Sequence, residues 1–245
     1  MKLLERLSHR AARFRPAAPV DLGAMGGVLS ISFDDFPQSA WTEGGPVLAQ
    51  HGVKATYYVA GGLCGGRNLD LPQFEVEHLQ ALATAGHEVG CHTFGHQSVL
   101  PMSRRALADS LDRNAGWVAE RLNGYRMQTF AFPYGDWSYG AKTVVAGRFR
   151  SGRGVRDGLN AGRADRAGLN AIGLESRRLP GYDFERLAGE AAMRDGWLIA
   201  YGHDVSDKPT DYGCTQGDLE RLILAARRAG LEILPVSAAL DRVLR

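Results

Sequence analysis

VLSISFDD, residues 28–35, decides the fold, because it joins an apolar run to two adjacent carboxylates. The run Val28–Phe33 is too apolar for a half-exposed strand, so it predicts a strand that is buried on both faces. Such strands belong to parallel sheets that helices cover. Asp34 and Asp35 then stand at the end of a parallel strand, where α/β folds gather their functional side chains.

Strand-like runs alternate with helical segments along the whole chain. The predicted strands are Val28–Phe33, Val53–Ala60, His87–Cys91, Thr129–Phe132, Trp197–Tyr201 and Leu231–Val236, with weaker candidates near Arg148–Arg153 and Asn170–Leu174. The predicted helices are Glu75–Ala85, Arg104–Leu122, Phe184–Arg194 and Leu219–Ala229, with N-caps at Ser103 and Asp218 and stops at Gly86 and Gly230. This alternation predicts parallel pairing through right-handed crossovers. Seven or eight such units in 245 residues favour a barrel over an open sheet.

Composition and charge narrow the function classes. The net charge of +2 and the absence of a Lys/Arg block with interleaved aromatics give no support for a nucleic-acid partner. Three scattered cysteines form neither a disulfide framework nor a zinc motif, which fits a reducing setting. Arginines interrupt every apolar piece of the first 20 residues, and no run reaches the ~20 apolar residues of a membrane span. We therefore expect a cytoplasmic protein without a transmembrane segment, with only peripheral membrane contact open to it.

The domain organisation follows from the same patterns. Residues 1–25 are expected to be a basic lead-in, and residues 26–245 a single catalytic domain. The Gly- and Arg-rich stretch Gly147–Gly168 has an unusual composition and lies between strand–helix units. We expect it to form a long loop over the barrel.

Polar side chains follow several of the predicted strands. His92 comes directly after the strand His87–Cys91, and His96 follows four residues later. On one helical turn this spacing puts both imidazoles on one face, and a tight loop can do the same. Together with one carboxylate, two such histidines leave coordination positions open, as a catalytic zinc or similar divalent ion requires. Taken singly, the aspartate pair also fits a helix cap or turn. The histidine pair also fits a solvent-facing or capping role.

Two more polar residues end later strands. Tyr134 follows the strand Thr129–Phe132, and His203 follows Trp197–Tyr201 by two residues. Gly202 permits an unusual turn that carries the imidazole over the barrel mouth, where it suits proton donation to a leaving group. Asp204 either orients this histidine or caps the next element.

Taken in order, these segments resemble the polysaccharide deacetylase family, also called carbohydrate esterase family 4 or the NodB homology domain. SFDD at 32–35 resembles the family's first motif, and HTFGH at 92–96 its second, H-[ST]-x-x-H. FAFPYG at 130–135 resembles the third motif, and LIAYGH at 198–203 the last. The resemblance implies a distorted (β/α)7–8 barrel of the NodB type.

The resemblance also implies a mononuclear site for a divalent metal, with Zn²⁺ as the first choice. Its ligands would be Asp35, His92 and His96. Asp34 would be the general base that takes a proton from the attacking water.

The remaining catalytic roles follow from the resemblance too. His203 would be the general acid that protonates the departing amine, and the backbone N–H of Tyr134 would stabilise the oxyanion.

Three features depart from the family pattern. Phe36 stands where the first motif usually has glycine, and Ala131 replaces the arginine of the third motif that pairs with the catalytic base. The base would then need another cation or would have a higher pKa. Arg153 and Arg156 are candidates for the cation, with plain surface charge as the alternative for both. The fourth motif, an Asp/Trp pair that tunes the acid histidine, is not recognisable.

These observations predict a metal-dependent hydrolase that removes acetyl groups from an N-acetylated carbohydrate. Without a signal segment, a glycan precursor or sugar lipid made inside the cell is favoured over a cell-wall polymer. Phe36, Trp137 and Tyr139, and also Trp41, are placed on rim loops, where they either stack on a sugar ring or pack against a helix. Two alternatives remain. One is a relative that cleaves a cyclic amide or ureide, and the other is a catalytically silent carbohydrate-binding protein.

Overall fold

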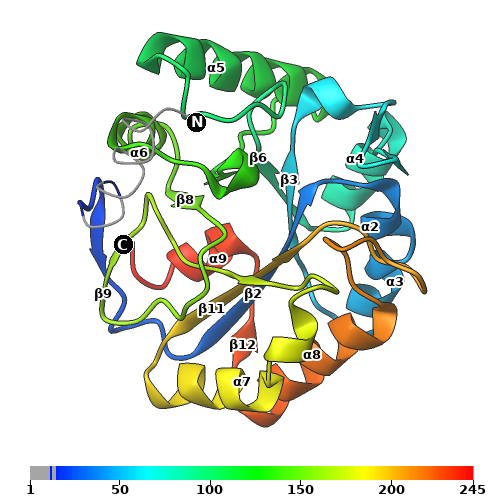
Figure 1. The fold of residues 1–245 in the computed structure, drawn as a ribbon, viewed down its shortest axis with the longest axis vertical. Helices are drawn as coiled ribbons and strands as arrows, with labels where there is room; N and C mark the ends of the chain where they lie inside the picture. The colour runs from blue at the N-terminus through cyan, green and yellow to red at the C-terminus, as the bar shows by residue number, and fades with distance from the viewer. Residues whose placement is uncertain (1–11, 13–14, 245) are drawn as a thin grey trace.

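A parallel sheet forms the centre of the computed structural model, which describes residue 12 and residues 15–244 (Figure 1). The strands are β1 (Pro19–Asp21), β2 (Val28–Asp35), β3 (Thr56–Val59), β4 (Arg67–Asn68), β5 (Leu71–Pro72), β6 (Glu88–Cys91), β7 (Thr129–Ala131), β8 (Ser151–Arg153), β9 (Arg163–Asp165), β10 (Ile172–Gly173), β11 (Trp197–Gly202) and β12 (Glu232–Ile233). In the main sheet the order is β10-β11-β2-β3-β6-β7-β8, with β12 also paired to β2.

Strand β2 lies in the middle of this sheet, and all eight of its residues are buried. β11 pairs with it in parallel from Val28 to Phe33 on one side. On the other side β12 pairs with Val28 and Leu29, and β3 pairs with the last four residues. The strand buried on both faces that the sequence predicted is therefore confirmed.

The sheet curls toward closure at its two outer strands. After β8 the chain returns so that Leu169 forms a parallel bridge with Arg153, and β10 then pairs with β11. The Leu169 N–H donates a hydrogen bond of 2.9 Å to the Gly152 carbonyl, a length typical of a strand ladder. The result is an α/β fold with a parallel half-barrel, in agreement with the predicted distorted barrel.

Helices surround the sheet (Figure 1). They are α2 (Gln38–Thr42), α3 (Gly44–Gln50), α4 (Val76–Thr84), α5 (Arg104–Arg121), α6 (Tyr139–Ala146), α7 (Phe184–Met193), α8 (Gln216–Arg228) and α9 (Val236–Leu240), with 3₁₀ turns η1 (Gly61–Leu63), η2 (Pro133–Gly135) and η3 (Leu179–Gly181). The four helices predicted from sequence are present, whereas α2, α3, α6 and α9 were not predicted.

Most predicted helix ends are confirmed. Ser103 caps α5 by accepting the Ala106 N–H, and Gly86 and Gly230 follow α4 and α8 with φ of 83° and 77°. Asp218 was predicted as the N-cap of α8, but the cap is Thr215. Asp218 is the third helical residue, and its carboxylate bonds back to Thr215 in a capping box.

Two segments of unusual composition differ from simple loops. The stretch Gly147–Gly168, expected to be one long loop, contains β8 and β9. β9 pairs antiparallel with β1, which lies in the expected lead-in 1–25. Residues 1–11 and 13–14 of that lead-in fall outside the described residues. Among the residues described, no helix combines the length and the apolar character needed to cross a membrane.

Candidate metal centre

The turns that carry the predicted ligands have an unusual backbone. Asp35, Thr93, His96 and Tyr134 adopt left-handed conformations, with φ of 63°, 61°, 48° and 59°. Each such non-glycine residue costs roughly 1–2 kcal/mol, and residues of this kind cluster at functional sites. The strain therefore falls at the ends of β2, β6 and β7, where the predicted chemistry lies.

Asp35, His92 and His96 come together at the carboxyl end of the sheet. Their ligand atoms all lie within 4.8 Å of one another. The Asp35 Oδ1 is 2.9 Å from the His96 Nε2 and 3.4 Å from the His92 Nε2. Asp35 and His92 are buried, and His96 is nearly so. The three residues predicted as metal ligands are thus neighbours in space.

The atoms of His92 and Asp35 that point away from the cluster form hydrogen bonds with neighbouring residues. His92 Nδ1 lies 2.8 Å from the Ala131 carbonyl, to which it donates, so Nε2 is the nitrogen that points inward, toward Asp35. The Asp35 Oδ2 accepts a 2.7 Å hydrogen bond from Asn68 Nδ2, which leaves Oδ1 facing the two imidazoles. Asn68 was not predicted, because no sequence motif places the β4–β5 hairpin beside β2.

A divalent cation fits this arrangement. The Asp35 Oδ1 is fully buried and accepts no well-directed hydrogen bond, although two imidazole nitrogens face it. Burial raises the pKa of Asp35, but the imidazoles of His92 and His96 outweigh it and hold that pKa below its usual range. A charged carboxylate oxygen and two imidazole nitrogens, which give up their protons when a cation binds, are the donor set of a zinc-type site with open positions. These three residues could therefore hold the ion.

Asp34, the adjacent carboxylate, has a different partner. It forms an ion pair with Arg153, the last residue of β8, and both side chains are buried. The guanidinium carbon of Arg153 also lies 5.0 Å from the ring centres of Tyr58 and Tyr201. Arg156, the other candidate, is exposed and lines a separate small cavity. The cation beside Asp34 is thus Arg153.

His203 and Tyr134 face the same pocket as the three candidate ligands. His203 Nδ1 lies 3.2 Å from the Tyr212 carbonyl, so its Nε2 is the atom left for chemistry. The Tyr134 ring packs on His96 with 4.7 Å between ring centres, and its hydroxyl donates to the His96 carbonyl. Asp204 does not bond to the His203 ring. It accepts from the backbone and hydroxyl of Thr210, and so holds the loop that carries Tyr212.

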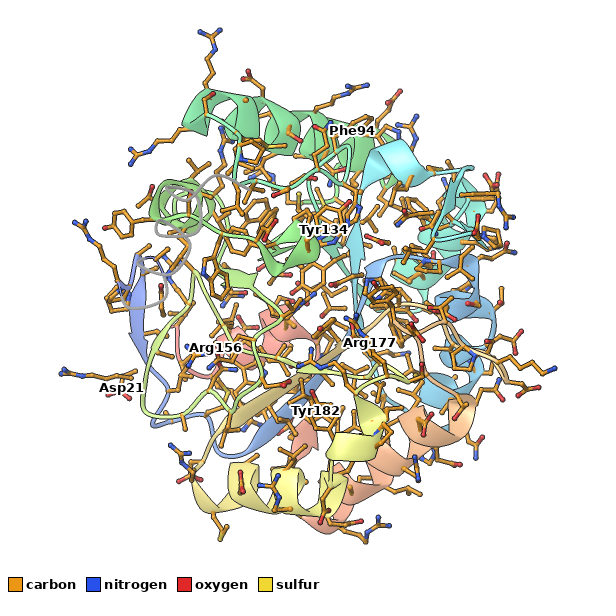
Figure 2. All side chains as sticks on the ribbon, in the orientation of Figure 1. Asp21, Phe94, Tyr134, Arg156, Arg177 and Tyr182 are labelled. Carbon is orange, nitrogen blue, oxygen red and sulfur yellow. The ribbon has the colours of Figure 1, made fainter. Side chains whose placement is uncertain are left out.

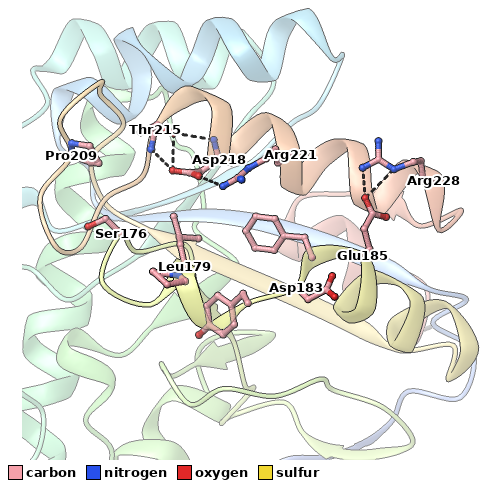
Figure 3. A pocket seen from close by; sticks show the side chains of 12 residues that line it. Ser176, Leu179, Asp183, Glu185, Pro209, Thr215, Asp218, Arg221 and Arg228 are labelled. Atoms are coloured by element: carbon pink, nitrogen blue, oxygen red, sulfur yellow. Dashed lines mark hydrogen bonds and ion pairs between the residues drawn. The ribbon is translucent and has the colours of Figure 1, made fainter.

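The pocket has a volume of about 260 Å³. Its lining residues are Asp34, Asp35, Asn68, Leu69, His92, His96, Tyr134, Val155, Glu175, Arg177, Tyr201, His203 and Tyr212. Tyr134 and Arg177 both lie near the centre of the view over the sheet (Figure 2). A larger hollow, about 780 Å³, lies between the η3–α7 segment and α8 and contains none of the predicted site residues (Figure 3).

A model of the family described as polysaccharide deacetylase matches residues 24–147, which is half of the chain. The chain belongs to the polysaccharide deacetylase family. The matched segment contains the two aspartates, both predicted histidine ligands and the PYG turn at 133–135. The resemblance seen in the motifs is therefore confirmed.

The chain is similar to three known proteins in different degrees. Uncharacterized protein YlxY of Bacillus subtilis is 27% identical over 101 residues, which is 41% of this chain and 29% of that protein. The chain thus spans less than a third of the length of the curated relatives it matches. A family 4 acetyl xylan esterase from Clostridium thermocellum, solved with a cobalt ion, shares 21% identity at a TM-score of 0.59 over 87% of this chain and 90% of that one. A pseudoenzyme of carbohydrate esterase family 4 from Bacillus anthracis shares 14% at a TM-score of 0.55, over 88% and 66%.

The aromatic residues for which the sequence left sugar stacking or packing open do not line this pocket. Phe36 is fully buried and stacks on Phe74 with 4.9 Å between ring centres, because its left-handed backbone turns the ring into the core. Trp137 is buried against Phe132, and Tyr139 begins α6 with Arg15 over its ring. Trp41 packs edge-on against Tyr57 and His87. The aromatic residues that line the pocket are Tyr134, Tyr201 and Tyr212.

Proposed function

We propose that this chain is a metal-dependent hydrolase that removes N-acetyl groups from an amino-sugar-containing glycan or glycan precursor. The observation that carries the proposal is the convergence of Asp35, His92 and His96 beside the buried Asp34–Arg153 pair, in a pocket that His203 also lines. Membership of the family supports deacetylation as the reaction class. The acetylated carbohydrate as substrate is our inference from that membership.

Asp35, His92 and His96 would hold a divalent ion, with Zn²⁺ the first choice for a site of two imidazoles and one carboxylate. When bound, such an ion supplies Lewis-acid polarisation of the amide carbonyl and activation of water near neutral pH. Asn68 and the Ala131 carbonyl fix the directions of the Asp35 and His92 donor atoms.

Asp34 and His203 divide the proton transfers in this proposal. Asp34 takes a proton from the attacking water, and Arg153 holds the carboxylate in place and compensates its charge. His203 gives its Nε2 proton to the departing amine, with its ring orientation set by the Tyr212 carbonyl. The backbone N–H of Tyr134, on the strained turn after β7, is proposed to stabilise the oxyanion.

The rival functions lack a supporting contact. A catalytically silent protein has the same fold in the Bacillus anthracis pseudoenzyme, so the fold does not separate the two possibilities. The presence of the chemistry-bearing residues together in one pocket supports the enzyme over the silent protein. Cleavage of a cyclic amide was suggested by the altered third motif and the unrecognised fourth; for the third, Arg153 supplies the cation beside Asp34, which supports the deacetylase.

The test combines metal analysis with acetate release from N-acetylglucosamine oligomers. Wild-type protein is expected to retain about one divalent ion and to release acetate, and chelation should abolish that release until metal is restored. Asp35→Asn should lose the ion and the activity. His203→Asn should keep the ion and lose at least about 100-fold in kcat, the scale of one general-acid contribution.

Asp112→Asn, an exposed aspartate on α5, serves as the matched control and should behave as wild type. If Asp35→Asn kept full metal content, the metal-site assignment would be wrong. If metal-loaded wild type opened cyclic amides but released no acetate, the proposed reaction would be wrong.

A further inference from the structure

The geometry points to Arg177 as the residue that selects the substrate, by binding an anionic group, a phosphate or a carboxylate, carried by the N-acetylated sugar. This inference rests on the proposed function and adds the chemical class of the substrate. Arg177 follows β10 and lines the pocket together with the candidate metal ligands.

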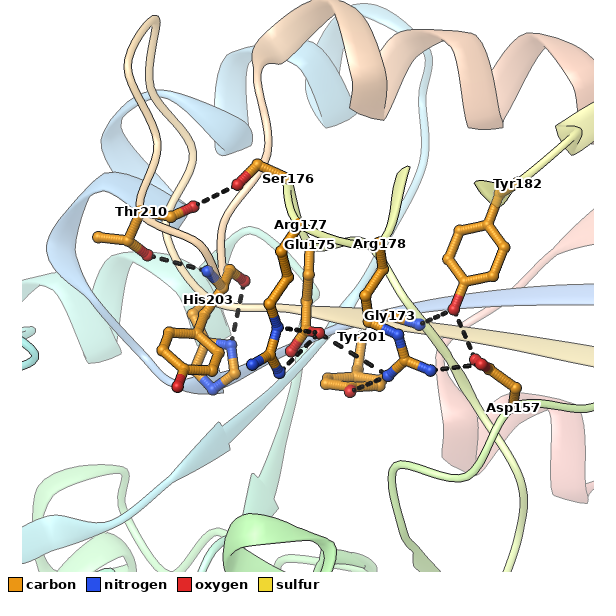
Figure 4. Close-up of polar contacts among 11 residues, drawn as sticks. Asp157, Gly173, Glu175, Ser176, Arg177, Arg178, Tyr182, Tyr201, His203 and Thr210 are labelled. Carbon is orange, nitrogen blue, oxygen red and sulfur yellow. Dashed lines mark hydrogen bonds and ion pairs between the residues drawn. The ribbon is translucent and has the colours of Figure 1, made fainter. Parts of the chain in front are cut away.

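The carboxylate of Glu175 holds the Arg177 guanidinium in place through two hydrogen bonds (Figure 4). Glu175 is only 1% exposed, and its Oε2 accepts from Arg177 Nε and Nη2 at 3.2 and 3.1 Å. The same oxygen lies 3.7 Å from Arg178 Nη1. A buried carboxylate is costly unless cations compensate it, so Glu175 is fixed by two guanidinium groups. The orientation of Arg177 is thereby set before any ligand arrives.

Arg178 is already paired with other side chains. Its Nη1 donates to the Tyr201 hydroxyl at 2.8 Å, and its Nη2 pairs with Asp157 at 2.5 Å. Asp157 in turn accepts from the Tyr182 hydroxyl at 2.5 Å (Figure 4). Arg178 is therefore a support for Glu175.

Arg177 keeps one donor edge free. Its guanidinium lies 4.2 Å from the centre of the Tyr212 ring, and its Nη1 has no hydrogen-bond partner among the described residues. The side chain is 45% exposed although it lines a pocket. The Tyr212 carbonyl also orients His203. The Arg177 guanidinium therefore stacks on the residue that positions the proposed acid.

The pairing of charges around the pocket leaves one donor edge of Arg177 for an anion. Among the thirteen lining residues, all within the described chain, Arg177 is the single Arg or Lys. Asp34 is paired with Arg153, and Asp35 faces two imidazoles. Glu175, the third lining carboxylate, takes the Nε and Nη2 donors of Arg177 and shares Arg178, so Nη1 is the edge that remains. A fixed guanidinium with exposed N–H groups matches phosphate and carboxylate oxygens. A neutral acetamido sugar has no group that requires it.

The experiment measures the ratio of affinities for anionic and neutral sugars. Probes are N-acetylglucosamine 1-phosphate and 6-phosphate, N-acetylmuramic acid, and neutral methyl N-acetylglucosaminide, studied by calorimetry and by acetate release. The metal-loaded wild type should bind at least one anionic sugar at least about 10-fold more tightly than the neutral sugar. One charge-assisted hydrogen bond provides a difference of this size. Arg177→Gln should bring this ratio to near one, and Arg177→Lys should keep part of it.

Arg221→Gln removes an exposed arginine on α8 outside this pocket and should leave the ratio as in wild type. The phosphate and carboxylate probes identify which anion is preferred. If acetate is released equally from both kinds of sugar, or Arg177→Gln keeps the wild-type ratio, the inference is wrong while the proposed function stands. If anionic sugars bind through Arg177 and no acetate is released, the function is wrong and the subsite stands. If no sugar binds, both are wrong.

Discussion

At the scale of single residues, the buried pair of Asp34 and Arg153 shows how the same contact can be supplied from a different strand. In the family pattern the cation comes from the third motif, where this chain has Ala131. Here it comes from the next strand of the sheet, β8, and reaches the same carboxylate. Ala131 keeps a role through its carbonyl, which orients His92.

We expect Arg153→Met to lower the free energy of unfolding by about 3–5 kcal/mol, because it leaves the buried Asp34 carboxylate without its cation. The double variant Asp34→Asn with Arg153→Met should recover part of this loss, since the unpaired charge is gone. Urea unfolding measures both. Arg156→Met, at an exposed arginine three residues on, should stay within about 0.5 kcal/mol of wild type. Equal losses at the two arginines would contradict the pairing.

Asn68 carries the second prediction at this scale. Asn68→Ala should weaken divalent-metal affinity about 10- to 100-fold, because the Asp35 Oδ2 loses the donor that holds it. Competition with a chromogenic chelator measures the affinity. Leu69→Ala changes the neighbouring pocket residue without removing a polar atom, and should leave metal binding near the wild-type value. A similar loss in both variants would indicate that the hairpin, not the hydrogen bond, supports the site.

The sequence predicted the convergence of Asp35, His92 and His96 and missed the side chains that support it, for a physical reason. Asp35, His92 and His96 lie at the ends of strands, so the rule for parallel sheets places them near one another. Asn68, Glu175 and Arg177 come from segments with no periodic pattern, and their positions depend on how those segments fold back over the barrel mouth. The sequence left open whether Phe36 and Trp137 stack on a sugar or pack within the protein, because sequence alone does not give the direction of a side chain on an irregular turn; both are buried.

At the scale of elements, the long apolar strands and the long amphipathic helices were predictable, whereas short elements were not. β2, β6 and β11 match the predicted runs within two residues at each end. Helices α2 and α3 have only five and seven residues. Pro37 directly precedes α2, and α3 begins with Gly44 and Gly45, which are residue types typical of turns. The pairing of β1 with β9 joins residues more than 140 apart, which no local pattern encodes.

The turn after β2 gives an element-scale prediction. Phe36 has φ 69° where the family usually has glycine, and its ring packs on Phe74 and Tyr57. Phe36→Gly would relieve roughly 1–2 kcal/mol of backbone strain but lose about 3–5 kcal/mol of core packing. We therefore expect the free energy of unfolding to fall by about 2–3 kcal/mol, measured in urea.

Asn123→Gly is the matched control for strain alone. Asn123 has φ 49° and is exposed, so glycine there should be neutral or should stabilise the protein by up to about 1 kcal/mol. A Phe36→Gly protein that is more stable than wild type would mean that backbone strain, not aromatic packing, dominates this turn.

At the scale of the whole molecule, the chain before β2 is attached to the segment that closes the barrel. The Lys142 ammonium, buried on α6, pairs with Asp165 at the end of β9 and donates to the Ala12 carbonyl at 2.8 Å. The Asp165 carboxylate also accepts from the N–H groups of Ala17 and Ala18. One buried ion pair thus joins the early chain, α6 and the β9 segment, which returns toward β10.

The pKa of Asp165 determines how this attachment responds to acid. Burial raises the pKa of that carboxyl, but Lys142 and the N–H groups of Ala18 and Ala17 outweigh it, and the pKa lies below its usual value. The unfolded chain therefore binds the proton first. The stabilisation is complete above the unfolded pKa of about 4, and it is lost as the pH falls through the folded value.

Lys142→Met should lower the free energy of unfolding at pH 7 by about 3 kcal/mol, because Asp165 keeps its charge and loses its cation. The difference from wild type should shrink in acid, since protonation of Asp165 removes the ion pair from wild type and the unpaired carboxylate charge from the variant. Urea unfolding at several pH values measures this, and hydrogen exchange should show faster opening at Val20, which pairs with Ala164 across β1 and β9. Lys208→Met, at an exposed lysine, should match wild type throughout. If the Lys142→Met deficit stayed constant from pH 7 to pH 3, the ion pair would not be its cause, and the lost packing of the lysine stem would be.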